Sequence, residues 1–352
     1  MRREDASRMS EEASGPYHHL RVTRVIDETA DAKSIVLDVP PDLKQTFAYR
    51  AGQFLSFRVE VDGHRLVRCY SLASSPATDA AHKVTVKRVE EGRVSNWMND
   101  NVREGDVLEV MPPNGVFVLQ PEREAPIVLF GGGSGITPVI SILKTALSTT
   151  SRPVKLIYAN RNEDSIIFKQ ELSELLAAYV GRLEVVHRLD DLHGFVDEAR
   201  VVQEVGPLRD ADFYICGPGP FMDVVERALQ GLGIERDRIF IERFESPDEA
   251  PVAQGEVDAS EGTLVTIRLD GEETDVVVSE GETILAAARR VGLEPPFACE
   301  EAYCGCCMAK VVEGEVDMRM NDGGIDQKQI DQGWVLTCQG EPRSRVRVEY
   351  PD

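Results

Sequence analysis

The chain has 352 residues, of which 42% are hydrophobic and 28% charged, so its length predicts two or three globular domains of ordinary composition. Its formal net charge of −22 argues against a nucleic-acid partner, because phosphate binding requires a basic surface. No apolar run approaches the roughly 18 residues of a membrane span, and the polar N-terminus has no apolar signal-peptide core. We therefore expect a cytoplasmic protein with a flexible tail over residues 1–16.

Residues 17–121 are expected to form a small antiparallel β-barrel. Short segments of alternating apolar and polar residues, for example 54–61 and 83–89, are separated by turn signals. Few helical patterns interrupt them, which is typical of an all-β unit closed on itself.

The pattern changes over residues 122–246, where apolar strands alternate with helices. The predicted strands cover 126–130, 155–159, 183–189, 212–216 and 238–244, and the predicted helices cover 137–147, 167–179 and 221–229. Such βαβ alternation predicts an α/β domain built on a parallel sheet.

An acidic segment over residues 247–262 lacks apolar periodicity and predicts an interdomain linker. The last block, residues 263–352, is expected to fold separately. Its first predicted elements are two strands and a helix, over 263–269, 275–279 and 283–292. The helix ends at Gly292, a residue type that favours helix termination.

Five of the seven cysteines lie between Cys299 and Cys338, a pattern better suited to a metal site in a reducing compartment than to secreted disulfides. Cys299, Cys304, Cys307 and the distant Cys338 have the C-x4-C-x2-C…C spacing of a plant-type [2Fe-2S] cluster. A zinc ribbon is the alternative, but it favours paired C-x2-C units, and one such pair is present. Cys306 is expected to be a non-ligating thiol beside these four metal ligands.

This last block resembles plant-type ferredoxin domains of the β-grasp fold, which implies an α+β architecture. It departs from their usual loop at Ala302, a position that is commonly glycine, without losing a ligand. The intact ligand spacing argues against a degenerate, cluster-free docking domain. With 9 Lys and Arg against 18 Asp and Glu from Thr263 to Asp352, the acidity of the block could serve solubility or dock a basic redox partner.

The segment Arg68-Cys69-Tyr70-Ser71 carries residue types that suit a flavin nucleotide. The guanidinium of Arg68 can neutralise a phosphate, Tyr70 offers an aromatic face, and Ser71 offers a hydroxyl to the N5 edge of the ring. Taken alone, the motif fits a buried strand with one salt bridge equally well. It is preceded by AGQF and followed by KRVEEGRVSNW, in which backbone N–H groups at a helix start suit a diphosphate.

These three motifs, in this order, resemble those of the ferredoxin–NADP reductase superfamily, which implies FAD. The FAD contacts that the resemblance implies come from Arg68, Cys69, Tyr70, Ser71, Val86, Lys87, Gly92, Val94, Ser95, Thr137 and Phe244. Phe244 is a candidate to cover the flavin ring where nicotinamide must stack, although a core phenylalanine explains it equally well.

A glycine-rich turn over residues 130–138 lies between a predicted strand and a predicted helix, where backbone amides can meet a phosphate. It is not the G-x-G-x-x-G fingerprint, because Ile136 takes the place of the last glycine. The segment CGPGP resembles the CGP motif of the same superfamily, which would set Cys216 beside the nicotinamide, whereas an isolated cysteine there would be a core residue. The implied nucleotide contacts are Gly132, Gly133, Asn160, Arg161, Cys216, Gly217, Pro218 and Met222.

The coenzyme is expected to be NADH, with NADPH as the alternative. A 2′-phosphate favours several cations. Arg161 is available at the end of the second predicted strand of the α/β domain, but Glu163 and Asp164 oppose it.

The domain order resembles that of the reductase components of multicomponent bacterial oxygenases. Segments such as RCYSLASSP and ICGPGPFM are most similar to 3-ketosteroid 9α-hydroxylase reductases, followed by phenylacetyl-CoA epoxidase reductases. The resemblance implies hydride transfer from NAD(P)H to FAD, with Ser71 and Cys216 positioning the rings. Single electrons would then pass through the cluster to a Rieske-type or di-iron oxygenase, and the chain would be monomeric. A stand-alone NAD(P)H oxidase or flavohaemoprotein-like enzyme is the alternative, opposed by only six histidines and no globin-like helical block.

Overall fold

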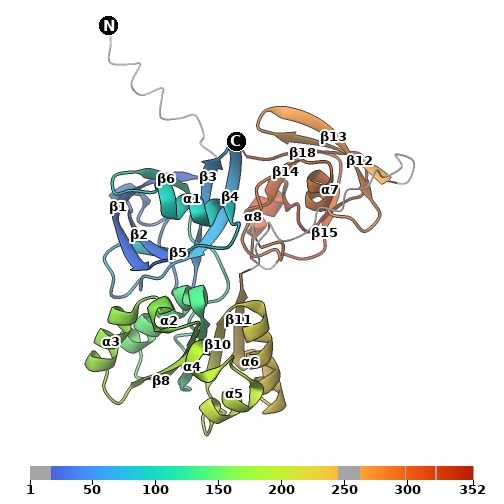
Figure 1. The fold of residues 1–352 in the computed structure, drawn as a ribbon. Coiled ribbons are helices and arrows are strands. Elements are labelled where there is room, and N and C mark those ends of the chain that lie inside the picture. The colour runs from blue at the N-terminus through green and yellow to red at the C-terminus, as the bar shows by residue number, and fades with distance from the viewer. Residues whose placement is uncertain (1–16, 245–261, 298, 322, 352) are drawn as a thin grey trace. The chain divides into compact units, whose positions relative to one another are not determined.

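The computed structural model describes residues 17–244, 262–297, 299–321 and 323–351 (Figure 1). The expected tail over residues 1–16 and residues 247–261 of the expected linker lie outside the described residues, and Gly262 begins a strand. The chain divides into two compact units, one made of Leu20–Leu108 with Pro113–Pro251 and the other mainly of Val252–Asp352. Each unit is described by itself.

An antiparallel barrel opens the first unit, as its alternating sequence predicts. Its sheet order is β4-β3-β6-β1-β2-β5, and a bridge between Leu72 and Val84 joins the two end strands. Apolar side chains of its strands, such as Leu37 and Leu55, are fully buried. The elements are β1 (His18–Thr29), β2 (Ala32–Asp38), η1 (Pro41–Leu43), β3 (Phe54–Val61), β4 (His64–Ser71), β5 (His82–Lys87), α1 (Arg93–Asn101) and β6 (Val107–Val110).

The second half of this unit, the nucleotide domain, is a five-stranded parallel sheet in the order β11-β10-β7-β8-β9. Apolar residues of α2 and α3 pack on one face of the sheet, and those of α5 and α6 pack on the other. The parallel sheet predicted from the βαβ pattern is thereby confirmed. Its elements are β7 (Ile127–Gly132), η2 (Gly133–Gly135), α2 (Ile136–Thr149), β8 (Val154–Asn160), η3 (Glu163–Ser165), α3 (Lys169–Ala178), β9 (Leu183–Leu189), α4 (Asp190–His193), α5 (Glu198–Val205), β10 (Asp212–Gly217), α6 (Gly219–Gly231), η4 (Arg236–Arg238) and β11 (Ile239–Arg243).

A group of four charges joins the barrel to the nucleotide domain. Lys144 of α2, with 6% of its side chain exposed, lies 2.6 Å from Asp79 and 2.7 Å from Glu171. Lys83 of β5 lies 2.8 Å from the other oxygen of Glu171. We call Asp79, Lys83, Lys144 and Glu171 the Lys144 network. Because each charge has an opposite partner, the network fixes the two halves against each other without an unpaired buried charge.

The second unit, the ferredoxin domain, has a mixed sheet in the order β13-β12-β18-β14-β16 and a two-stranded sheet of β15 and β17. Ile284, Ala287 and Ala288 of α7 pack into the core formed by the larger sheet, which confirms the α+β prediction. The elements are β12 (Gly262–Leu269), β13 (Glu272–Ser279), α7 (Ile284–Arg290), β14 (Met308–Glu313), β15 (Val316–Met318), α8 (Gln327–Asp331), β16 (Trp334–Leu336), β17 (Gly340–Pro342) and β18 (Val346–Glu349).

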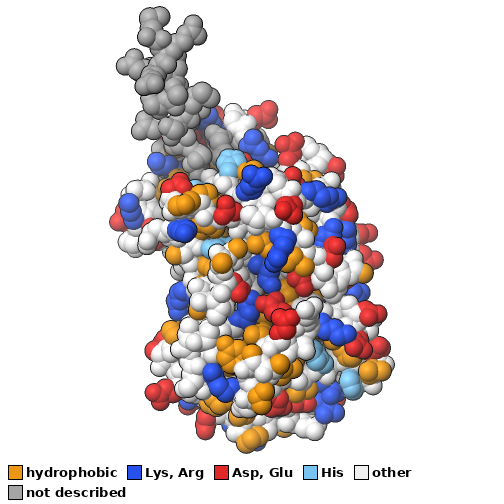
Figure 2. Space-filling view, turned by 90° about the vertical axis from the view of Figure 1, so that its left-hand side faces the viewer, with side chains coloured by type: hydrophobic (Ala, Val, Ile, Leu, Met, Phe, Trp, Pro, Cys, Tyr) orange, Lys and Arg blue, Asp and Glu red, His pale blue; other side chains and the backbone are white. Residues whose placement is uncertain are grey.

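The surface carries charges of both signs. On the face shown in Figure 2, Lys and Arg side chains lie among Asp and Glu side chains, with apolar groups between them. Among the described residues, no helix combines the length and the apolar character that crossing a membrane requires.

Candidate functional site

A cavity of about 780 Å³ opens between the barrel and the carboxyl ends of the strands of the nucleotide domain. Most of the residues expected to meet FAD line it, together with part of the CGP motif. These residues are Arg68, Cys69, Tyr70, Ser71, Lys87, Gly92, Val94, Ser95, Thr137, Gly217, Pro218 and Phe244. Segments far apart in the sequence therefore converge on one space, which lies in the 300–1,000 Å³ range of small-molecule sites.

The hydroxyl of Ser71 is an unpaired polar group at this cavity. Ser71 ends β4, its side chain is 2% exposed, and its Oγ has no hydrogen-bond partner among the described residues. A buried hydroxyl without a partner is costly, and a ligand atom that bonds to it would remove that cost. This orphaned Oγ fits the expected contact with the polar edge of a flavin ring.

The start of α1 forms a second part of the cavity wall. Its N-cap is Gly92, which has no side chain to cap the helix, and the N-terminal end of a helix directs its first backbone N–H groups outward from the helix. Ser95 lines the cavity there while its Oγ accepts a hydrogen bond from the backbone N–H of Val89 at 3.1 Å. With Arg68 on the same cavity wall, this arrangement fits the negative charge of a diphosphate.

The glycine-rich turn approaches the CGP segment closely enough to exclude side chains. A Cβ at Gly135 would overlap the carbonyl oxygen of Cys216, and one at Gly132 would press on Pro218. Thr137 and Ser134 also line the cavity from this turn. Glycine is therefore required where the two loops meet.

Cys216 lies behind the cavity wall rather than on it. Its thiol is fully buried at the end of β10, whereas Gly217 and Pro218 face the cavity. Burial raises the pKa of the thiol well above 9.0, and the nearby Glu242 carboxylate raises it further. The thiol is therefore neutral at physiological pH, suited to packing and hydrogen bonding and not to nucleophilic attack.

Glu242 is a residue that the sequence reasoning missed. It is the register partner of Cys216 on the neighbouring strand β11, and it is 6% exposed. The available signal was a carboxylate inside the mostly apolar segment IFIERF, because a carboxylate is rarely fully buried unless it is paired.

The remaining expected nucleotide and flavin contacts lie outside the cavity wall. Asn160 ends β8 with a buried amide that has no hydrogen-bond partner among the described residues, whereas the side chain of Arg161 is 66% exposed. Gly133 begins η2 beside the turn. Met222 packs in the apolar core under α6, and Val86 is buried in the barrel, so the structure does not bring these two side chains to the cavity.

The four expected cluster ligands are buried together in the ferredoxin domain. Cys299, Cys304, Cys307 and Cys338 are each 7% exposed or less. A hydrogen bond from the Cys304 thiol lowers the pKa of Cys299 to about 7, and one from Cys307 lowers the pKa of Cys338. The same hydrogen bond with Cys338, together with burial, raises the pKa of Cys307 well above 9.0. The two hydrogen-bonded pairs of buried thiols offer the four sulfur ligands that a [2Fe-2S] cluster requires.

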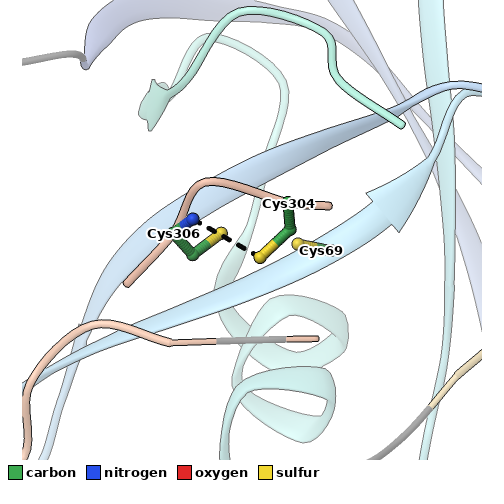
Figure 3. Close-up of side chains that lie close together, drawn as sticks. All are labelled: Cys69, Cys304 and Cys306. Atoms are coloured by element: carbon green, nitrogen blue, oxygen red, sulfur yellow. Dashed lines mark hydrogen bonds between the residues drawn. The ribbon is translucent and has the colours of Figure 1, made fainter. Parts of the chain in front are cut away.

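Backbone N–H groups in the loop point at the sulfurs. Glu301 donates to Cys299 Sγ, and Cys306 donates to Cys304 Sγ, each at 3.4 Å (Figure 3 draws the second bond). Cys306 is itself buried, with its sulfur within 4.8 Å of that of Cys304. Its expected role as a bystander thiol remains a prediction.

Ala302 adopts a backbone conformation that favours glycine. Its φ is +64°, and the neighbouring Glu300 and Gly305 also have positive φ values, of +53° and +74°. The carbonyl of Ala302 accepts a hydrogen bond from Gly324 at 2.9 Å. Its methyl group is 1% exposed and packs in the apolar cluster that includes Cys307 and Cys338. The loop therefore keeps its geometry at this position although its side chain departs from the usual glycine.

Three family models match the chain in the order that the fold shows. They are the oxidoreductase FAD-binding domain over residues 19–119, the oxidoreductase NAD-binding domain over 129–227, and the 2Fe-2S iron-sulfur cluster binding domain over 267–343. The three models together account for the barrel, the parallel sheet and the ferredoxin domain.

Full-length relatives share the same organisation. A 3-ketosteroid-9-alpha-monooxygenase ferredoxin reductase component from Rhodococcus rhodochrous is 43% identical over 94% of this chain and 96% of its own length. A 1,2-phenylacetyl-CoA epoxidase component from Escherichia coli K12 is 37% identical over 95% of this chain and 98% of its own. The solved phthalate dioxygenase reductase, at 24% identity, matches 95% of this chain and 98% of its own with a TM-score of 0.59, which shows a shared fold.

The resemblance inferred from the motifs is thus confirmed, as are the cofactor types FAD, a nicotinamide dinucleotide and a [2Fe-2S] cluster. The chain belongs to the family of flavin and iron–sulfur reductases that includes the ferredoxin reductase components of bacterial oxygenases.

Proposed function

We propose that this protein is the reductase component of a multicomponent bacterial oxygenase, taking electrons from NADH and delivering them one at a time to its oxygenase. The observation that carries the proposal is the 43% identity over 94% of the chain to one such component, because it spans all three cofactor-binding parts. Supporting it, the described cavity and the four converging cysteines lie in the parts matched by the flavin, nucleotide and cluster models.

FAD and the [2Fe-2S] cluster, when bound, would supply the hydride and one-electron redox chemistry that the protein itself lacks. The protein would hold these groups in place. Arg68 and the start of α1 bind the diphosphate, and Ser71 donates or accepts a hydrogen bond at the polar edge of the flavin. Phe244, 43% exposed at the cavity, would cover the flavin ring and would give way to the nicotinamide.

In the ferredoxin domain, Cys299, Cys304, Cys307 and Cys338 would supply the four thiolates. The backbone N–H groups that donate to two of these sulfurs stabilise their negative charge. Four thiolates would retain the cluster, and the buried loop that carries them would keep water away from the irons.

We propose steroid 9α-hydroxylation as the reaction that the partner oxygenase carries out, because the relatives with 43% and 39% identity are components of that system. Phenylacetyl-CoA epoxidation is the second candidate, since the epoxidase component is 37% identical at similar coverage. The oxygenase would be of the Rieske or di-iron type. The free thiols suit the reducing cytoplasm, where the reductase would act as a monomer.

Matched cysteine variants test the electron path. Cys304→Ser should keep NADH-driven reduction of ferricyanide, which the flavin can reduce directly, and should lose reduction of cytochrome c, a one-electron protein acceptor. Cys306→Ser, two residues away in the same loop, should retain both activities. Equal loss of both activities in Cys304→Ser, with FAD still bound, would show that the cluster does not follow the flavin.

Absorbance and oxygen uptake separate the remaining classes. The purified protein should show flavin bands together with a broad iron–sulfur shoulder, and it should consume little oxygen with NADH alone. Flavin bands alone with rapid oxygen uptake would support a stand-alone oxidase. Purified 3-ketosteroid 9α-hydroxylase and phenylacetyl-CoA epoxidase oxygenases, each supplied with its own substrate, then decide which partner supports NADH-driven turnover.

A further inference from the structure

Asp31 links two cations at the edge of the nucleotide domain. It lies in the turn between β1 and β2 of the barrel, and its Oδ2 is 2.6 Å from Nη2 of Arg161 and 3.8 Å from Nζ of Lys87. Arg161 immediately follows β8, and Lys87 ends β5. The Asp31 carboxylate of the barrel thus pairs with Lys87 of the barrel and with Arg161 of the nucleotide domain, which lies 130 residues away in the sequence.

These cations lie where a dinucleotide presents its phosphates and adenosine ribose. In doubly wound sheets the phosphates meet the glycine-rich turn after the first strand, and the ribose 2′ position meets the end of the second strand. Here those strands are β7 and β8, so Arg161 occupies the second location. Lys87 lies beside the first, because a Cβ at Gly133 would be 3.6 Å from its Nζ.

We propose that Asp31 makes this reductase select NADH over NADPH, by pairing with Arg161, the cation that would otherwise bind a 2′-phosphate. The inference rests on the proposed nicotinamide-dependent function and adds a specificity-determining residue from the barrel. Among the described residues, Asp31 is the ion-pair partner of Arg161. A 2′-phosphate, with a charge of about −1.5 to −2, would have to displace this carboxylate or lie next to it.

Carboxylates near the end of β8 add to the effect of Asp31. Lys169, the cation on α3, is 2.7 Å from Glu163 and is therefore already paired. Asp190 and Asp191 begin α4, and the backbone N–H of Asp191 donates to the carbonyl of Arg161 at 3.1 Å. The carboxylates of Asp31, Asp190 and Asp191 would thus oppose the charge of a 2′-phosphate, whereas a 2′-hydroxyl carries no charge to oppose.

The position of Asp31 is fixed by its own turn. Thr29 donates from its hydroxyl to Asp31 Oδ1 at 2.7 Å, and the backbone N–H of Arg88 donates to the Asp31 carbonyl at 2.7 Å. Burial alone would raise the pKa of Asp31, but the Thr29 hydroxyl and the charges of Lys87 and Arg161 outweigh it and lower the pKa below 3.8. The carboxylate is therefore ionised and held in place throughout the neutral pH range.

The test is Asp31→Asn, which removes the charge and keeps the shape. We expect the ratio of kcat/KM for NADPH to that for NADH, measured with ferricyanide, to rise about three- to tenfold, because the pair is partly exposed and screened. Binding of 2′,5′-ADP, measured by isothermal titration calorimetry on the FAD-loaded protein, should tighten by a similar factor relative to 5′-AMP. In an Asp31→Asn/Arg161→Ala double variant both gains should disappear.

Asp27→Asn is the matched control, since it removes a carboxylate of β1 whose side chain is 82% exposed and whose ion-pair partner is Lys33 at 3.8 Å. It should leave both ratios unchanged. An equal gain in affinity for 2′,5′-ADP and 5′-AMP would overturn the proposal, because the freed cations would then bind groups that both nucleotides share. Unchanged ratios in Asp31→Asn would also overturn it. A wild-type protein that retains FAD yet oxidises neither coenzyme would instead overturn the proposed function, and this inference with it.

Discussion

Cys216 and Glu242 are register partners on the parallel strands β10 and β11, and both side chains are buried where the sheet meets the cavity. A carboxylate at this depth raises the pKa of the Cys216 thiol, after burial itself. It would also supply a negative potential next to the CGP segment, where a nicotinamide ring is expected to become positively charged as it gives up hydride.

We therefore expect Glu242→Gln to slow flavin reduction by NADH about 10- to 100-fold while leaving the bound FAD content unchanged. Glu242→Asp, which keeps the charge, should lose less. Stopped-flow bleaching of the flavin absorbance at saturating NADH measures the effect. A Glu242→Gln rate equal to that of the wild type would show that the carboxylate serves packing alone.

Arg68 is expected to retain FAD through its charge. It lies on β4 at the cavity, and replacing it by alanine removes the guanidinium next to the expected diphosphate position. Loss of one charge-assisted pair costs about 1.5–3 kcal/mol, so FAD should bind about 10- to 100-fold more weakly. Arg65→Ala, an exposed position on the same strand, is the control. An Arg68→Ala protein purified with a full complement of FAD, and with wild-type affinity, would contradict this role.

The sequence predicted the elements and cofactors whose signals are local. The strand over residues 54–61 is predicted from its alternating residues and is found as β3, whose second half alternates the buried Phe57, Val59 and Val61 with more exposed polar residues. The cluster ligands could be predicted because three of the four lie within nine residues of loop. By contrast, β15 and β16 have three residues each, too few to show any periodicity.

Relationships between distant segments could not be predicted in this way. The Asp31–Arg161 pair joins residues separated by 130 positions, and no sequence pattern near either residue predicts this contact. The packing of Cys216 against Glu242 depends on the register of two parallel strands, which the fold determines and the local sequence does not. Met222, expected to meet the nucleotide, is buried in the core under α6, and its expected contact remains a prediction.

The Lys144 network predicts that the flavin and nucleotide unit loses stability in acid. Burial would raise the pKa values of Asp79 and Glu171, but Lys144, through its hydrogen bonds and charge, holds both below their ordinary values of 3.8 and 4.5. Carboxyl groups with lowered pKa values in the folded state contribute stability above their unfolded values. That contribution is lost as the pH falls through the lower folded values.

Urea unfolding monitored at pH 7, pH 4 and pH 3 should show this loss. In Lys144→Met the two carboxylates lose their shared buried partner, so the free energy of unfolding at pH 7 should fall by about 3–5 kcal/mol, and its dependence on pH should flatten. Lys169→Met breaks a more exposed pair with Glu163 and should cost at most about 1 kcal/mol. Equal costs for the two variants would show that the network does not join the two halves.

Substitutions at Ala302 test how the cluster loop tolerates a non-glycine residue at a φ of +64°. Ala302→Gly should relieve about 1–2 kcal/mol of strain from the left-handed backbone conformation. It should also remove about 0.8 kcal/mol of stabilisation from the buried methyl group, and the more flexible unfolded chain should lower stability further. These effects offset, so the stability of the ferredoxin domain should change by less than about 1 kcal/mol. Ala302→Val combines a β-branched side chain with the same φ and a buried site, and it should destabilise the domain by more than about 2 kcal/mol.

Thermal unfolding, followed by circular dichroism, should give the Ala302→Val variant a clearly lower melting temperature than the Ala302→Gly variant and the wild-type protein. Iron content per chain should follow the same order, because the Ala302 methyl packs among Cys307 and Cys338 and a displaced loop would separate these thiols. A valine variant with wild-type stability and iron content would mean that the loop adopts a different backbone at Ala302. In that case the strain argument would fail, while the assignment of the four ligands would stand.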